Sequence, residues 1–204
     1  MTNRTVRMTA PTHRTLEGGG FPVRRPAAMG SLMSPFLLLD EMGPVEWGPR
    51  EAIGAPNHPH RGFETFTVIN KGTIDHSDSL GAIARFGDGD AQWLTAGDGI
   101  NHSEMFPLFN KQSNNILDFF QIWINLPSYN KRVEPNFQMY WNKQIPKINV
   151  KDKTGITSSV ELISGKFEEK ESPAAPPNSW ANDINNHFAV WIIHLKRKGS
   201  FLIP

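Results

Sequence analysis

Apolar and polar residues alternate over short runs along most of the chain, and this two-residue period is typical of β-strands. Residues 63–69, FETFTVI, show it clearly. Before residue 110 no stretch keeps a 3.6-residue period between helix caps. Glycine, proline, asparagine and aspartate end the runs at short, even intervals, as they do in antiparallel sandwiches and barrels. The pattern therefore predicts an all-β fold, and the jelly roll is one form it could take.

Several strands can be placed before residue 130. Residues 34–44, SPFLLLDEMGP, form a short apolar run that we expect to end at Gly43-Pro44. Residues 63–69 lead into Asn70-Lys71-Gly72, which has the composition of a hairpin turn, so residues 73–81 are predicted to return beside them. A further strand is predicted at DFFQIWIN, which Pro127 stops.

The chain beyond residue 146 continues with β-prone runs. Residues 147–150 and 158–164 are predicted strands, and the charged, proline-rich segment 167–180 is predicted to be a loop. Both faces of a strand at residues 189–195 would be apolar: Ala189, Trp191, Ile193 and Leu195 on one, Phe188, Val190 and Ile192 on the other. We expect this strand to pack on the N-terminal barrel, to pair with a second chain, or to be poorly ordered and prone to aggregation.

Composition excludes several classes of function. The 204 residues carry a formal net charge of +1 with acids and bases interspersed, so the sequence indicates no surface for nucleic acid or for a membrane. No apolar run approaches the ~20 residues of a membrane span. There is no cysteine, which rules out disulfides and thiolate metal sites. The first twenty residues lack the apolar core of a signal peptide, so we expect a cytoplasmic protein.

Two pairs of polar residues carry the candidate chemistry. His58 and His60 are two positions apart, and so are His102 and Glu104, so on strands each pair would point to one face. Three imidazoles and a carboxylate facing each other inside a barrel suit a divalent first-row metal and leave coordination positions open. One such pair alone would not decide between a metal ligand and a surface histidine, but two pairs favour a metal site.

The roles of two further side chains, Glu64 and His76, are left undecided by their positions in the sequence. Glu64 shares the parity of His60 and could replace Glu104 as the carboxylate ligand, unless Gly62 marks a bulge that alters the parity. His76 is more simply a hydrogen-bonded strand histidine, and a supporting role beside the metal is the alternative.

The motifs PHRGFET, HSDSLG, GDAQWLTAGDGINHSEM and QIWINLP, in this order within residues 20–147, resemble those of the pirin family in the cupin superfamily. The resemblance implies two jelly-roll β-barrel domains in tandem and one metal, usually iron, in the first. It assigns His58, His60, His102 and Glu104 as the ligands, and thus favours Glu104 over Glu64.

The same resemblance implies the organisation of the chain. Residues 1–146 are expected to form the complete N-terminal cupin barrel with the metal site. Residues 147–204 resemble only a linker and the opening strands of the second cupin domain, so we expect a second barrel that is truncated and cannot close.

As function, the resemblance implies a quercetin 2,3-dioxygenase-like enzyme with one divalent metal ion, Fe(2+), acting on a flavonol-like aromatic substrate and molecular oxygen. Glu104 would be the catalytic base, and no substrate-binding residue can be assigned. The alternative is a non-catalytic, redox-sensing iron protein that regulates a protein partner, either a transcription regulator or a metabolic enzyme. A fragment that binds metal and does neither is the third reading. An open cavity beside the metal would favour the enzyme.

Overall fold

The computed structural model describes residues 9, 11–26, 33–51 and 54–203, and nearly all of their regular structure is β-strand. The described helical turns are three-residue 3₁₀ turns: η2 (Ser128–Asn130), η3 (Asn142–Gln144), η4 (Trp180–Asn182) and η5 (Ile184–Asn186). The all-β fold class predicted from the alternating pattern is therefore confirmed. Among these residues, no helix has the length and apolar character needed to cross a bilayer. The cytoplasmic location stays a prediction.

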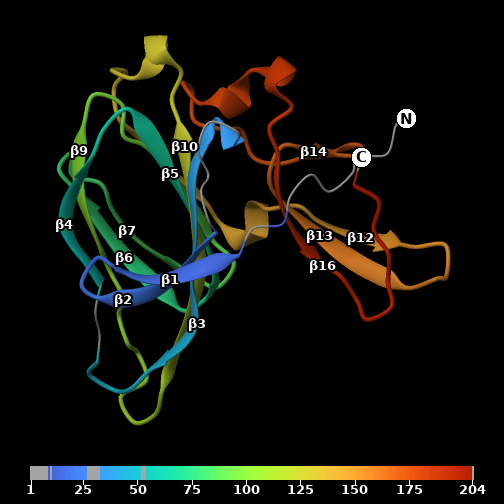
Figure 1. Ribbon diagram of the computed structural model, residues 1–204, viewed down its shortest axis with the longest axis horizontal. Helices are drawn as coiled ribbons and strands as arrows, with labels where there is room; N and C mark the ends of the chain where they lie inside the picture. Colours follow the sequence, from blue (N-terminus) through green and yellow to red (C-terminus); the bar gives the residue numbers. More distant parts are fainter. Residues whose placement is uncertain (1–8, 10, 27–32, 52–53, 204) are drawn as a thin grey trace.

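Two antiparallel sheets face each other in the N-terminal part (Figure 1). The larger sheet has seven strands, in the order β1 (Thr12–Glu17), β2 (Phe21–Pro26), β3 (Phe36–Trp47), β10 (Asn115–Asn125), β5 (Phe63–Lys71), β8 (Ala91–Thr95) and β11 (Asn136–Tyr140). The smaller sheet has four, in the order β4 (Gly54–His60), β9 (Ile100–Met105), β6 (Thr73–Asp78) and β7 (Ile83–Gly87).

Apolar side chains from both sheets fill the space between them. The buried cluster is Phe21, Val23, Met42, Ala55, Ile69, Ile74, Phe86, Phe106, Leu117 and Phe119. Phenylalanines dominate it, and Phe106 lies edge-on to both Phe21 and Phe119. This apolar interior holds the two sheets together and fixes the spacing across which the candidate site is built.

Two predicted details of the strands were wrong. β5 and β6 do not form a hairpin, because β5 pairs with β10 and β8 while β6 pairs with β9 and β7. Gly72, at a φ of +94°, carries the chain from one sheet to the other, so each strand can present an apolar face to the shared interior. β3 also does not end at Gly43-Pro44: the two residues form a bulge opposite β10, where a Cβ on Gly43 would lie 2.3 Å from the carbonyl oxygen of Leu117.

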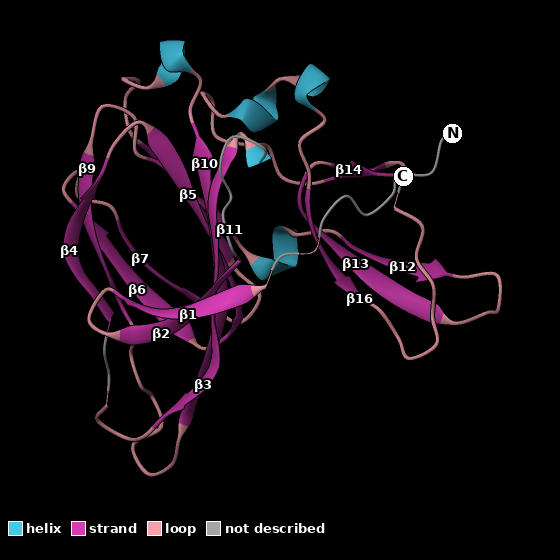
Figure 2. Cartoon of the chain, viewed as in Figure 1, coloured by secondary structure: helices cyan, strands magenta, loops and turns pink. Residues whose placement is uncertain are grey.

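The C-terminal part adds a three-stranded sheet, in the order β12 (Lys147–Lys151), β13 (Thr157–Ser164) and β16 (Val190–His194), and a small pair, β14 (Lys166–Phe167) and β15 (Lys170–Glu171) (Figure 2). Phe188, Val190 and Ile192 pack against Phe66 and Trp93 on the outer face of the seven-stranded sheet. The opposite face of β16 packs its apolar side chains on Val160, Leu162 and Phe167. Of the three outcomes expected for this strand, the structure shows the first, packing on the N-terminal part. The domain boundary at residue 146, and whether each barrel is complete, stay predictions.

Candidate metal centre

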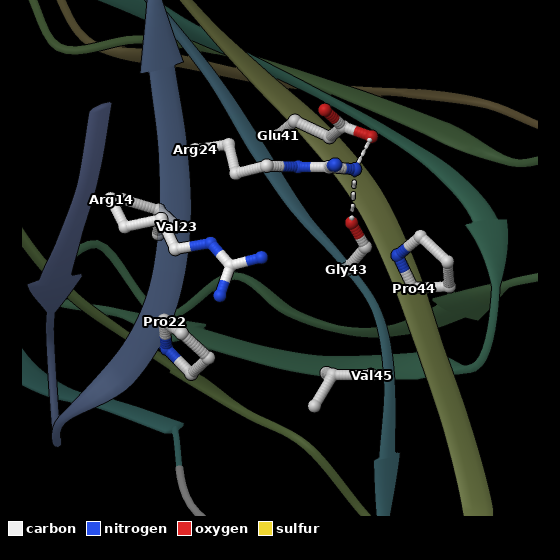
Figure 3. A pocket seen from close by; sticks show the side chains of 8 residues that line it. All are labelled: Arg14, Pro22, Val23, Arg24, Glu41, Gly43, Pro44 and Val45. Atoms are coloured by element: carbon white, nitrogen blue, oxygen red, sulfur yellow. Dashed lines mark hydrogen bonds and ion pairs between the residues drawn. The ribbon is translucent and has the colours of Figure 1, made fainter. Parts of the chain in front are cut away.

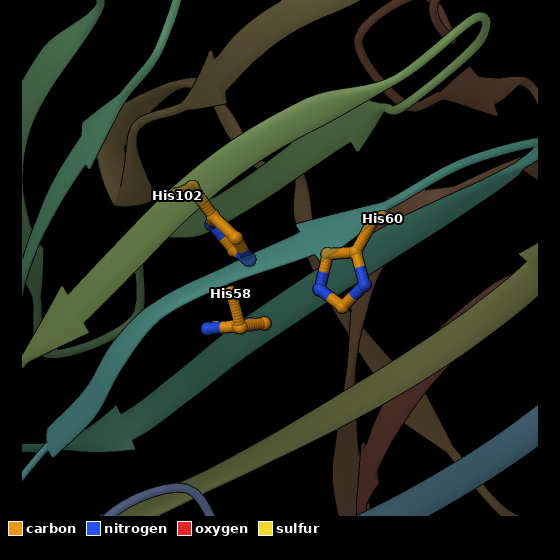
Figure 4. A group of neighbouring side chains, drawn as sticks. All are labelled: His58, His60 and His102. Carbon is orange, nitrogen blue, oxygen red and sulfur yellow. The ribbon is translucent and has the colours of Figure 1, made fainter.

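Three histidine rings converge between the two sheets (Figure 4). β4 provides His58 and His60, and the neighbouring strand β9 provides His102, which lies directly opposite His58 in the register. One nitrogen atom of each ring comes within 4.8 Å of the others. The structure therefore brings together three of the four side chains that the sequence singled out as ligands.

The nitrogens left without a partner fit a cation. The Nδ1–H of His58 donates to the carbonyl oxygen of Pro56 at 2.7 Å, which leaves its Nε2 as the free lone pair. The Nε2 atoms of His60 and His102 are buried and, among the described residues, have no hydrogen-bond partner. Unpaired buried polar atoms are rare in native proteins because desolvating them costs free energy. These two buried nitrogens and the Nε2 of His58 form the donor set that a divalent first-row metal prefers.

Burial also sets the charge of these rings. Desolvation, together with the smaller effect of the neighbouring histidines, lowers the pKa of His60 to about 4 and that of His102 to about 2. Both imidazoles are therefore neutral at neutral pH. Neutral imidazole is the form that ligates metals, so no proton has to be displaced from either ring.

Glu104 is the fourth predicted ligand and follows two residues after His102 on β9. Its Oε2 accepts a hydrogen bond from Gln121 Nε2 at 3.3 Å, and its buried Oε1 has no partner among the described residues. Burial raises the pKa of this carboxyl group. Glu104 lines the same cavity as His58 and His60 but stands outside the group of nitrogens within 4.8 Å. Its ligation stays a prediction.

Glu64 lies away from the three histidines, although it shares the sequence parity of His60. Its carboxylate accepts hydrogen bonds from Thr95 Oγ1 at 2.8 Å and Ser179 Oγ at 2.7 Å, in contact with the C-terminal part. The preceding side chain, Phe63, packs instead on His60. Gly62, at a φ of +75°, turns the chain between β4 and β5, so the alternation of faces does not carry over from one strand to the next.

Sequence reasoning missed three side chains that hold Glu104 or His76 in place. Gln121 holds Glu104, and the Nε1–H of Trp123 donates to Gln121 Oε1 at 3.0 Å. Asp78 accepts from His76 Nε2 at 3.0 Å. The first two lie in QIWINLP and the third in HSDSLG, so the motifs were visible in the sequence while the contacts were not. His76 is hydrogen-bonded on its strand, as expected, and it also contacts His102.

An open cavity of about 540 Å³ is lined in part by His58 and His60. The apolar part of its wall is formed by Phe21, Leu38, Met42 and Trp123. Its polar part holds an ion-paired group in which the Arg25 guanidinium donates to Asp40 and Glu17, each at 2.6 Å. Arg25 and Glu17 come from β2 and β1, so the first hairpin forms one side of the cavity. This combination of apolar surface and few polar groups is typical of sites for small organic ligands.

A second cavity, of about 320 Å³, lies between β2 and β3 (Figure 3). Arg24 donates to Glu41 and to the carbonyl oxygen of Gly43, and these pairs occupy the polar groups at its centre. Its lining contains no histidine. It therefore offers no metal chemistry comparable to that of the first cavity.

Comparison with known proteins gives a family match over the same region. The Pirin family model matches residues 20–124. A Pseudomonas aeruginosa protein named "Putative quercetin 2,3-dioxygenase" is 37% identical over 183 residues, which cover 88% of this chain and 60% of the relative. Human pirin is 38% identical over 167 residues, which cover 80% of this chain and 52% of the relative. The chain thus spans about half to three-fifths of the length of these relatives.

Solved structures give the same fold. A crystal structure of quercetin 2,3-dioxygenase from Acinetobacter baumannii superposes with a TM-score of 0.72 at 35% identity, over 82% of this chain and 58% of that one. A Geobacillus kaustophilus protein superposes with a TM-score of 0.65 at 28% identity, over 84% of this chain and 64% of that one. The predicted cupin architecture is confirmed by these similarities.

Proposed function

The chain belongs to the pirin family, and on that premise we propose that it is an iron-dependent dioxygenase acting on a flavonol-like aromatic substrate. Two of its relatives, from Pseudomonas aeruginosa and Vibrio cholerae, carry the name of a quercetin 2,3-dioxygenase with the qualifier "putative". The observation that carries the proposal for this chain is the 540 Å³ cavity lined by His58, His60 and Glu104, beside which His102 completes the group of three histidines.

We propose that the three histidines and Glu104 hold one Fe(2+) ion. The unpaired Nε2 atoms of His60 and His102 and the unpaired Oε1 of Glu104 support this assignment. A ferrous ion bound there would acidify a coordinated hydroxyl group and open a route for the substrate to react with oxygen.

The cavity supports an aromatic substrate by its size and its walls. A volume of about 540 Å³ lies within the range of roughly 300–1,000 Å³ found for sites of small organic ligands. The aromatic side chains of Phe21 and Trp123 line the cavity and would contact a ring system. The ion-paired group of Arg25, Asp40 and Glu17 belongs to the same lining and would exchange hydrogen bonds with phenolic hydroxyl groups.

Glu104 is proposed as the general base. Burial raises its pKa, so the carboxylate is a stronger base than an exposed one and can accept the proton of the flavonol 3-hydroxyl. Gln121 would keep one carboxylate oxygen in place while the other takes the proton. Trp123 in turn fixes the amide of Gln121.

The experiment combines elemental analysis of anaerobically purified protein with quercetin consumption and oxygen uptake by the same iron-loaded sample. We expect one iron per chain and turnover of quercetin. Glu104→Gln, loaded with the same amount of iron, should lower turnover by about 10²–10⁴-fold, since it removes the base. Glu46→Gln, at an exposed carboxylate on β3 that bonds Asn114, is the matched control and should leave turnover unchanged.

A fully iron-loaded chain that consumes no quercetin under oxygen would overturn the dioxygenase. The non-catalytic, redox-sensing alternative would then account for the site, and it requires that ferrous and ferric forms bind a protein partner differently. A chain that binds no metal at all would remove both readings.

A further inference from the structure

We propose that Asp78 and His76 are positioning residues that fix the tautomer of His102, so that its Nε2 offers a lone pair, and not an N–H, to the group formed with His58 and His60. The three side chains form one hydrogen-bonded line that starts at a surface turn and ends at the candidate metal centre. The tautomer can be measured on metal-free protein. Only its consequence for metal binding rests on the proposed function.

The line begins at the carboxylate of Asp78, which accepts hydrogen bonds from backbone N–H groups of the turn that follows it. Asp78 Oδ1 accepts backbone hydrogen bonds from Leu80 at 2.9 Å and from Ala82 at 3.1 Å. Its Oδ2 lies 3.0 Å from His76 Nε2. A carboxylate oxygen accepts hydrogen bonds, so the hydrogen between Asp78 and His76 is assigned to His76 Nε2.

The position of the hydrogen on His76 determines the position of the hydrogen on His102. A neutral imidazole that carries its hydrogen on Nε2 has a lone pair on Nδ1. His76 Nδ1 lies 3.3 Å from His102 Nδ1, so His102 must donate and carries its own hydrogen on Nδ1. The lone pair of His102 is then on Nε2, the buried atom for which no described residue provides a partner.

Strand register and burial make the line rigid. β6 and β9 pair antiparallel, with His76 opposite Glu104 and Asp78 opposite His102. The side chains of His76 and Asp78 are 0% and 1% exposed, so bulk water cannot replace either partner. The tautomer of His58 is fixed differently, because a backbone carbonyl accepts its Nδ1–H. Among the described residues no carbonyl accepts a hydrogen bond from His102, so its tautomer depends on side chains.

The substitution Asp78→Asn tests the direction of the line. The new amide can keep its oxygen on the backbone N–H groups of Leu80 and Ala82, and its NH₂ group then faces His76 Nε2 and can only donate. His76 must accept there and move its hydrogen to Nδ1. His102 Nδ1 must then accept, which places the hydrogen of His102 on Nε2 and blocks the lone pair.

The primary measurement is the ¹⁵N NMR spectrum of the His102 ring in metal-free protein, in which the two tautomers give distinct nitrogen shifts. We expect Nδ1–H in the wild type and Nε2–H in Asp78→Asn. The affinity for Fe(2+), titrated anaerobically against a chelator, should fall by about 10–100-fold. Asp75→Asn is the matched control: Asp75 lies on the same strand but pairs with exposed Arg85, so both readouts should stay at their wild-type values.

A second pair of variants keeps the test decisive if Asp78→Asn does not fold. His76→Gln offers an NH₂ to Asp78 and a carbonyl oxygen to His102, so it should preserve the Nδ1–H tautomer and most of the affinity. His76→Leu offers neither and should lose both. An Nδ1–H signal that persists in Asp78→Asn, or in His76→Leu, would overturn the proposal. A reversed tautomer with unchanged Fe(2+) affinity would support the proposal and count instead against His102 as a metal ligand.

Discussion

Glu64 shows how one residue can be fully buried without belonging to the candidate site. It is 0% exposed, and Thr95 and Ser179 are its hydrogen-bond partners. Loss of hydration raises its pKa to about 7, although both hydroxyl groups lower it in part. Its ordinary value is 4.5. The carboxyl group therefore titrates near neutral pH in the folded chain.

This shift predicts a pH dependence of stability. The folded state binds the proton of Glu64 more tightly than the unfolded state, so the stabilisation is fully present below pH 4.5 and is lost as the pH rises through about 7. Glu64→Gln cannot ionise and should flatten this part of the profile, gaining roughly 3 kcal/mol over the wild type at pH 8. Urea unfolding of both proteins between pH 5 and 8 measures this difference in the free energy of unfolding. Glu46→Gln should keep the wild-type slope; a parallel slope in Glu64→Gln would contradict the assignment.

For single residues, the sequence predicts which side chains of one strand share a face. The i, i+2 spacing was sufficient to place His58 and His60 on one face, because alternation within a strand is local. Parity could not place Glu64, since Gly62 turns the chain between two strands. The contacts of Gln121 with Glu104, and of Asp78 with His76, depend on strand pairing and burial, which local spacing does not contain.

Among the elements, β16 shows the two-sided burial that its sequence predicts. Phe188 precedes it and lies in the contact between the C-terminal part and the seven-stranded sheet, with its ring 5.5 Å from that of Phe36 and 5.8 Å from that of Trp93. Apolar side chains on both faces leave this strand one stable position, between two clusters.

Shortening Phe188 should loosen this contact. Phe188→Ala removes a half-buried ring and should lower the free energy of unfolding by about 2–3 kcal/mol, as large-to-small changes in a packed cluster do. Leu195→Ala is the matched control, because Leu195 is 55% exposed and its loss should cost within about 0.5 kcal/mol. Denaturant unfolding of both variants gives the comparison, and equal costs would contradict the packing described.

Strands with an alternating pattern, such as β5, or with a dense run of β-prone residues, such as β10, β13 and β16, were placed from sequence. β1, β2 and β11 were missed. The second of these reads FPVRRP, with two prolines and two arginines, and it forms because Arg24 and Arg25 pair with Glu41 and Asp40 on β3. Such tertiary ion pairs lie outside what a hydrophobic pattern records. The bulge at Gly43-Pro44 was also hidden, since the same dipeptide ends strands elsewhere.

For the whole molecule, the pairing of distant strands decides the fold, and local patterns do not give it. Alternation predicted strands and the fold class, while the family resemblance supplied the two-sheet arrangement. The hairpin expected at residues 70–72 was wrong for this reason: turn chemistry is local, but the choice of sheet depends on where each apolar face can be buried.

Metal binding should change the stability of the whole chain. An ion that binds only the folded state stabilises it by RT ln(1 + [L]/Kd), about 2.7 kcal/mol when Fe(2+) is at 100 times its Kd. We expect anaerobic Fe(2+) to raise Tm and a chelator to reverse the rise. His60→Ala removes one of the unpaired nitrogens and should abolish most of the shift, whereas His194→Ala, at an exposed histidine bonded to Glu161, should keep it. An equal rise in both variants would mean that the ion binds elsewhere.

The three converging histidines belong to one pair of neighbouring strands, β4 and β9, and the seven-stranded sheet contributes none of them. An ion needs only these two strands in register, so it can bind a chain in which the larger sheet has not yet formed. The metal would then stabilise the folding transition state nearly as much as the native state. We therefore expect Fe(2+) to accelerate refolding and to leave the unfolding rate almost unchanged in a stopped-flow chevron. An ion that slowed unfolding alone would indicate that β4 and β9 pair last.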